Sequence, residues 1–136
     1  MNIGIDATNI SRGGGITHLV ELLKVADPDV HNFSHIYIWS SSSTLETIND
    51  KPWITKIHST LLDKSLPFRV FYQNHLLSDE ARKLNCSILF VPGGTFLGDF
   101  RPFVVMCQNM LPFETKEMKR YGLSLTFLKF ILLRAT

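Results

Sequence analysis

Short apolar runs alternate with stretches of helical periodicity along most of the 136 residues, and this alternation limits the fold more than any other feature. Apolar runs of about four to eight residues between turn residues are typical of buried strands. The strands expected on this basis are Asn2–Ala7, Ser34–Trp39, Trp53–His58, Cys86–Val91 and Phe103–Cys107. Because strands that alternate with helices favour βαβ units, the sequence predicts an α/β fold, a Rossmann-like parallel sheet flanked by helices. We expect about four to six strands, with Ile5, Ile38, Leu89 and Val105 on central ones.

The expected helices follow from apolar residues spaced at i, i+3, i+4 and i+7. In the first helix these residues are Ile16, Leu19, Val20 and Leu23. We expect that helix to stop near Asp27 and Pro28. Further helices are expected around Leu45–Ile48 and over Leu66–Leu84.

Length, composition and charge fit a single globular domain over residues 1–136. Hydrophobic residues make up 45% and charged residues 19% of the chain, close to the averages of globular proteins. A formal net charge of +2 without a basic stripe argues against nucleic acid as a partner. Since the amino terminus has no basic start followed by an apolar stretch, we expect a cytoplasmic protein that contacts a membrane at most peripherally.

Cysteine and histidine residues give no sign of a disulfide framework or a metal site. Cys86 and Cys107 each lie in or beside an apolar run, where a thiol behaves as a small buried hydrophobe. The histidines have no metal-ligand spacing, and no nucleophile motif accompanies them. We therefore assign no metal, no cofactor and no catalytic residue, and interpret His18 and His58 as surface or hydrogen-bonded side chains.

A glycine-rich loop joins the first expected strand to the first expected helix. Arg12, Gly13, Gly14 and Gly15 precede the helix, where free backbone N–H groups and the helix dipole favour an anion. The glycines of this loop therefore predict a phosphate site at the start of the helix, with a simple tight turn as the alternative. A dinucleotide fingerprint would need a glycine where His18 stands, and no P-loop motif is present.

A second loop, Pro92–Thr95, follows the expected strand Cys86–Val91. In open α/β sheets, ligands bind outside the carboxyl ends of the strands. Gly93 and Gly94 are therefore candidate binding residues, with an ordinary βα turn as the alternative.

Four motifs occur in order along the chain: Ile5–Asn9, Gly13–Leu19, Val91–Gly94 and Gln108–Glu114. Together with Arg120–Gly122, this series resembles the amino-terminal half of family 4 glycosyltransferases over essentially the whole chain. The resemblance implies a GT-B fold, in which two Rossmann-like domains face each other across a cleft. The first domain binds mostly the acceptor and the second mostly the nucleotide sugar, and residues 1–136 correspond to the first.

The resemblance also implies roles for individual residues. The loop Arg12–Gly15 would face the diphosphate and sugar of the donor, and Gly93, Gly94, Gln108 and Asn109 would lie on the acceptor side. Many members of the family have a histidine where this chain has Gln108. Glutamine forms hydrogen bonds but does not titrate, so the resemblance provides no acid–base residue.

The donor domain of the family carries a Glu-x7-Glu signature, and no two glutamates in these 136 residues have that spacing. We therefore expect the chain to contribute the acceptor side and the glycine loop to sugar transfer, and to be inactive until a second domain completes the cleft. The expected partners are a nucleotide-sugar donor and a saccharide or lipid-linked acceptor. The alternative is a non-catalytic binding or interaction module that retains the fold.

The last stretch, Leu123–Thr136, is apolar on nearly all sides. It is too short to span a bilayer, which requires about 20 apolar residues. An exposed apolar surface of this kind marks an interaction site. We expect residues 123–134 to be covered by a second copy of the chain, a membrane surface or the second domain, and expect self-association as the consequence.

Overall fold

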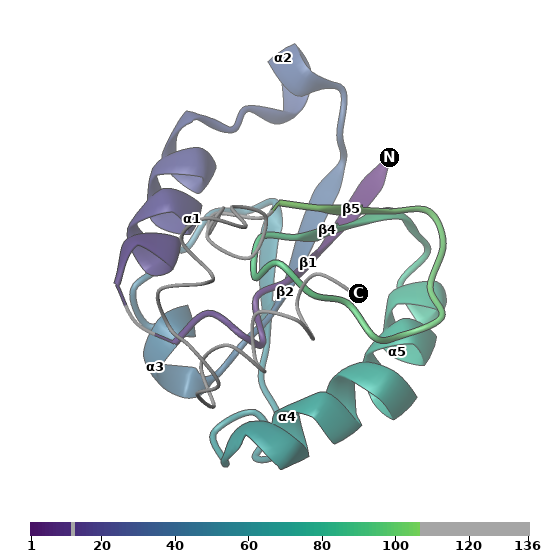
Figure 1. Ribbon diagram of the computed structural model, residues 1–136. Coiled ribbons are helices and arrows are strands. Elements are labelled where there is room, and N and C mark those ends of the chain that lie inside the picture. Colours follow the sequence, from purple (N-terminus) through teal and green to yellow (C-terminus); the bar gives the residue numbers. More distant parts are fainter. Residues whose placement is uncertain (12, 107–136) are drawn as a thin grey trace, which may run out of the picture.

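The computed structural model describes residues 1–11 and 13–106 and shows a five-stranded, all-parallel sheet flanked by helices (Figure 1). The strands are β1 (Asn2–Asp6), β2 (His35–Trp39), β3 (Ile54–Ile57), β4 (Cys86–Val91) and β5 (Phe103–Val105). The helical elements are α1 (Gly14–Val25), α2 (Pro28–His31), α3 (Ser42–Leu45), α4 (Leu66–Tyr72), the π-helical turn η1 (Gln73–Leu77) and α5 (Ser78–Lys83). The predicted α/β, Rossmann-like arrangement is thereby confirmed.

The order of the strands across the sheet is β3-β2-β1-β4-β5. The central strand, β1, pairs in parallel with β2 on one side and β4 on the other. From β1 the chain moves outward to β3, returns through α4, η1 and α5, and then moves outward again through β4 and β5. The direction thus reverses between β1 and β4. In sheets of this type, ligands bind outside the carboxyl ends of the strands at such a reversal.

Helices cover both faces of the sheet (Figure 1), and each face has its own apolar cluster. The cluster on the α1 side includes Ile5, Leu19, Leu23, Ile36 and Ile38. The cluster on the side of α4 and α5 includes Trp39, Tyr72, Leu77, Ala81 and Leu89. Ile38 and Trp39 are neighbours in β2 but lie in different clusters, because successive side chains of a strand point to opposite faces.

Most of the helical predictions are confirmed. The four apolar residues predicted to form the inner face of the first helix all pack in the α1-side cluster. The long helix runs from Leu66 to Lys83, as the pattern predicted, although η1 interrupts its α-helical geometry. The buried position of Cys86 is also confirmed, whereas Cys107 lies outside the described residues.

Three predictions differ from the structure. Val105 was expected on a central strand, whereas β5 is at the edge of the sheet that residues 1–11 and 13–106 form, and Val105 is 37% exposed. The short helix begins at Ser42 and ends at Leu45, earlier than predicted, because packing fixes it: Leu45 is buried and the Thr44 hydroxyl donates to the Ile10 carbonyl oxygen. The prediction missed α2, which Asp27 caps by accepting hydrogen bonds from two backbone N–H groups.

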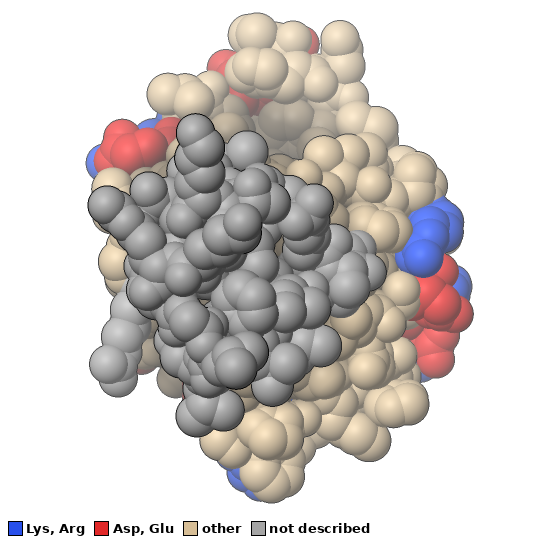
Figure 2. Space-filling view, in the orientation of Figure 1, with Lys and Arg blue, Asp and Glu red and all other residues tan. Residues whose placement is uncertain are grey.

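No helix within the described part of the chain is long and apolar enough to cross a membrane. Figure 2 shows one face of the molecule, on which lysine, arginine, aspartate and glutamate side chains lie around the rim. Charges of both signs occur there side by side, so the described surface in this view carries no stripe of a single sign.

Candidate functional site

The loops that follow β1 and β4 meet at the carboxyl edge of the sheet, where the strand order reverses. At Gly93, an added Cβ atom would lie 3.2 Å from the Cβ atom of Asn9, which belongs to the loop after β1. Such a distance is shorter than an ordinary van der Waals contact, so a glycine allows the two loops to approach. Gly94 has a φ of 84°, a left-handed conformation that favours glycine. The structure thus brings the predicted residues Gly93 and Gly94 next to the first loop.

The glycine-rich loop lies at the same edge and leads into α1. Gly13 is the N-cap residue of α1 with a φ of 73°, and Gly14 is the first residue of the helix. A glycine at the N-cap supplies no side-chain acceptor, and the first N–H groups of a helix have no partner within it. Among residues 1–11 and 13–106, an added Cβ atom at either Gly13 or Gly14 would meet no atom within 4 Å. The described residues therefore leave the start of α1 open, while Arg12 lies outside them.

Asp6 ends β1 and is the most deeply buried ionisable group near these loops, with 1% of its surface exposed. Its carboxylate accepts hydrogen bonds from the Thr8 backbone N–H (3.1 Å), from the Thr8 hydroxyl (2.6 Å) and from the Gln73 side-chain amide. Burial raises the pKa of Asp6 above its ordinary value, and the hydrogen bonds from Thr8 and Gln73 oppose part of this rise. Asp6 is thus a buried anchor for the loop after β1.

Gln73 joins this anchor to the loop after β4. The side chain is 1% exposed and lies in the π-helical turn η1. Besides donating to Asp6, its amide donates to the Thr95 carbonyl oxygen (3.2 Å), and its oxygen accepts from the Leu97 backbone N–H (3.4 Å). Single π-helical turns occur frequently at functional sites. Through Gln73, the two loops that line the carboxyl edge are fixed relative to each other.

Polar atoms without a partner lie near the same loops. Within the part of the chain that the structure describes, Asn9 Oδ1, Arg69 Nε and Asn74 Oδ1 are buried and form no hydrogen bond. The guanidinium group of Arg69 also donates to the Thr8 carbonyl oxygen at 3.3 Å, which places it beside the loop after β1. Unsatisfied buried polar groups are uncommon in folded proteins and call for an explanation such as a bound ligand.

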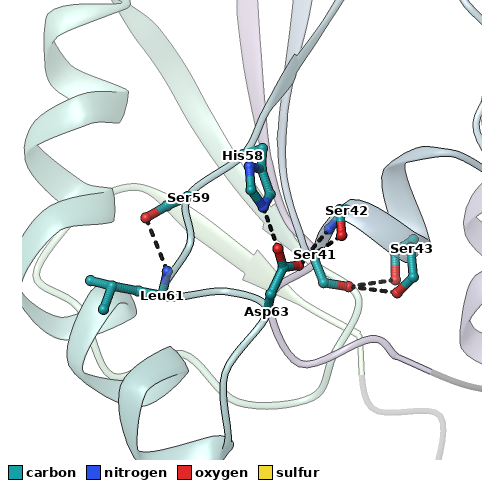
Figure 3. A network of polar contacts seen from close by, with 8 residues as sticks. Ser41, Ser42, Ser43, His58, Ser59, Leu61 and Asp63 are labelled. Atoms are coloured by element: carbon teal, nitrogen blue, oxygen red, sulfur yellow. Dashed lines mark hydrogen bonds and ion pairs between the residues drawn. The ribbon is translucent and has the colours of Figure 1, made fainter.

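A second polar cluster lies at the carboxyl ends of β2 and β3 (Figure 3). His58 Nε2 lies 2.6 Å from Asp63 Oδ2, and Asp63 Oδ1 accepts from the Ser42 backbone N–H (2.8 Å) and hydroxyl (3.0 Å). The Ser42 N–H, followed by the His58 hydrogen bond, lowers the pKa of Asp63. The Ser42 hydroxyl donates to Asp63, whose lowered pKa makes the carboxylate a weak base for activating a hydroxyl. The cluster joins the loop after β3 to the start of α3.

The site combines residues that the sequence predicted with others that it did not. Gly13, Gly14, Gly93 and Gly94 lie at one edge of the sheet, as the motifs required, whereas the predicted residues Gln108 and Asn109 lie outside the described residues. Asp6 and Gln73 were missed as site residues. For Asp6 the available signal was an ionisable residue at the carboxyl end of an apolar strand. For Gln73 it was a polar residue at i+3 from Val70 and i−4 from Leu77, on the apolar face of the predicted helix.

Metal-binding groups and similar proteins give no indication of the chemistry of this site. Among residues 1–11 and 13–106, no three histidine, cysteine, aspartate or glutamate side chains are grouped so that they could hold a metal ion. Comparisons of the chain with protein-family models, with curated proteins and with solved structures found no match. The arrangement of the loops is therefore the basis for any functional proposal.

Proposed function

We propose that this chain is the amino-terminal, acceptor-side domain of a nucleotide-sugar-dependent glycosyltransferase with the GT-B fold. The observation that carries the proposal is the open, glycine-lined start of α1 at the point where the strand order reverses. Backbone N–H groups and the positive end of the dipole of a 12-residue helix favour an anion there, and a donor diphosphate is such an anion. The motif series that resembles family 4 glycosyltransferases supports the same reading.

The buried hydrogen bonds of Asp6 and Gln73 fix the loops after β1 and β4 in position. Asp6 holds Thr8, and Gln73 connects Asp6 to Thr95 across the crevice. Positioning of two substrates contributes strongly to catalysis, and loops that are fixed by buried hydrogen bonds can hold a substrate in one position. Asn9 Oδ1 and Arg69 Nε lie beside these loops as a buried acceptor and a buried donor without partners among the described residues.

In this proposal the chain forms one wall of the cleft, and a second Rossmann-like domain supplies the other. Stabilising a departing nucleoside diphosphate requires charges placed around it in a site shielded from water. With one wall, the diphosphate remains in water, where charge interactions are weak. The 136 residues alone should therefore bind a nucleotide sugar weakly and transfer no sugar to a saccharide or lipid-linked acceptor.

The experiment is a titration of the purified chain with a panel of nucleotide sugars, followed by backbone amide NMR signals. We expect the largest shifts at Gly14, Gly15 and Ile16, and a loss of about tenfold or more in affinity for Gly14→Val, because the valine fills the space of the ligand. Thr17→Val is the matched control, since it changes an exposed side chain of the same helix turn and should bind normally.

Two results would contradict the proposal. A folded Gly14→Val variant that binds as tightly as the wild type would remove the glycine loop from the site. Absence of shifts with every nucleotide sugar, in a protein of monomeric mass, would favour the non-catalytic module instead. Release of nucleoside diphosphate by the purified chain alone would show that a second wall is not needed.

A further inference from the structure

An apolar groove of about 470 Å³ lies beside the carboxyl-terminal half of α1, over β1, β4 and β5. Its floor consists of strand side chains that point to the α1 side of the sheet, and its wall consists of residues at the end of α1. The floor is formed by Ile3, Ile5, Ile88, Phe90 and Val104. The wall includes Leu22, Val25 and Ala26, and among the described residues of the lining His31 is the one ionisable side chain.

The floor is continuous across three strands. Ile3 pairs with Ile88, and Ile5 pairs with Phe90, which in turn pairs with Val104. Val104 is 50% exposed and Val25 is 73% exposed, although both border the groove. Parallel sheets are almost always covered on both faces. In the described part of the chain, α1 covers only part of this face of the sheet. The apolar side chains of the groove are therefore left without a covering element among the described residues.

We propose that residues 123–134 of the same chain pack into this groove. The chain leaves β5 at the border of the groove and reaches residue 123 through residues 106–122. An extended chain reaches up to about 3.3 Å per residue, so residues 106–122 are more than long enough to run back along β4 or β5, which have six and three residues. The groove therefore has an apolar segment of matching chemistry within reach.

Size and chemistry both favour this occupant. A helix of the length of residues 123–134 would be about 18 Å long, close to the length of a six-residue strand such as β4. The only charged residues of this segment are Lys129 and Arg134. A segment tethered to the groove also has a much higher effective concentration than a second copy or a membrane. This inference does not depend on the proposed function.

Disulfide trapping in the full chain tests the proposal. One set of variants combines Val104→Cys with a cysteine in place of Leu125, Leu128 or Leu132. The matched set places the strand cysteine at Val105, the next residue of β5, whose side chain points to the opposite face. All variants carry Cys107→Ser. Cys86 remains, because burial raises the pKa of its thiol to about 11 and makes it unreactive near pH 8.

We expect at least one Val104→Cys variant to form a disulfide within the monomer, at a yield that does not change on dilution, and the Val105→Cys variants to form none. Equal trapping by both sets would overturn the proposal, as would no trapping at all. Disulfides found only in dimers would overturn it in favour of a second copy as the occupant.

Methyl NMR of the wild-type chain tests the same proposal without any variant that could fail to fold. With labelled methyl groups, contacts should appear between Ile88 or Val104 and the leucines of residues 123–134. Mixing two differently labelled samples distinguishes contacts within a chain, which we expect, from contacts between chains, which would contradict the proposal. Binding of residues 123–134 to phosphatidylcholine vesicles with loss of these contacts would likewise contradict it.

Discussion

The two faces of the sheet differ in how completely they are closed. On the side of α4 and α5, Trp39 and Tyr72 are fully buried and both donate hydrogen bonds to Glu80, so the polar groups of these two large side chains have a partner. On the α1 side, the floor of the groove carries apolar side chains that are only partly covered by described residues. The closed face fixes the loops of the candidate site, whereas the other face retains the capacity to receive another element.

The largest expected effect comes from truncating neighbours in β4 that point to opposite faces. Leu89 is fully buried on the closed face, and Leu89→Ala should lower the free energy of unfolding by about 2–5 kcal/mol through lost burial and a cavity. Ile88 lies on the groove side and is only partly buried by the described residues, so Ile88→Ala should cost less than Leu89→Ala: about 1 kcal/mol for an open groove, and more where residues 123–134 cover it. Urea denaturation measures both. Equal losses would show that the two faces are closed to the same degree.

A smaller effect is expected from the pH dependence of the buried network. Because the pKa of Asp6 is raised in the folded state, the folded chain keeps a proton that the unfolded chain has lost. Stability should therefore fall as the pH rises from about 4, near the unfolded pKa, through the folded pKa of Asp6. Asp6→Asn should lack this part of the fall.

Urea denaturation of both proteins from about pH 4 to pH 8 provides the comparison. The exposed carboxylates Asp63 and Asp99 have lowered pKa values, so their contribution is lost only below this range and does not mask that of Asp6. Parallel curves for the wild type and Asp6→Asn would mean that Asp6 does not carry the pH dependence.

The smallest effect is expected at the exposed edge, away from both faces. His58 and Asp63 are about 40% exposed, and an ion pair in water contributes little to stability. His58→Ala should leave the thermal unfolding midpoint unchanged within error. A clear drop in the midpoint would show that the cluster at β2 and β3 stabilises the sheet as much as the buried network does.

The sequence predicted the elements of the fold well, because buried strands and amphipathic helices leave a periodic apolar pattern. It also placed the glycine loops correctly, since glycine marks sharp turns and close approaches such as that of Gly93 to Asn9. Gln73 could be found only in part. It lies at i+3 from Val70 and i−4 from Leu77, on the apolar face of the predicted helix, which marks it as a buried polar residue. Its partners Asp6 and Thr95 lie far from it in sequence, so no local pattern identifies them.

Other differences arose from packing and capping. The position of Val105 at an edge depends on which strands pair, and no local pattern encodes that pairing. In the sequence pattern Asp27 and Pro28 mark the end of a helix. The same pair also begins one, with Pro28 in its first turn and the Asp27 side chain accepting from the Asp29 and Val30 N–H groups.

The π-helical turn η1 gives the long helix a property that its length alone does not suggest. Each residue of an α-helix adds about 100° of rotation, so the wider turn at Gln73–Leu77 offsets the angular positions of α4 and α5 from those of an unbroken α-helix. Insertion or deletion of one residue in this turn would swing Gln73 away from Asp6 while leaving every amino acid of the network in the sequence. The crevice therefore depends on the number of residues in this turn as well as on their identity.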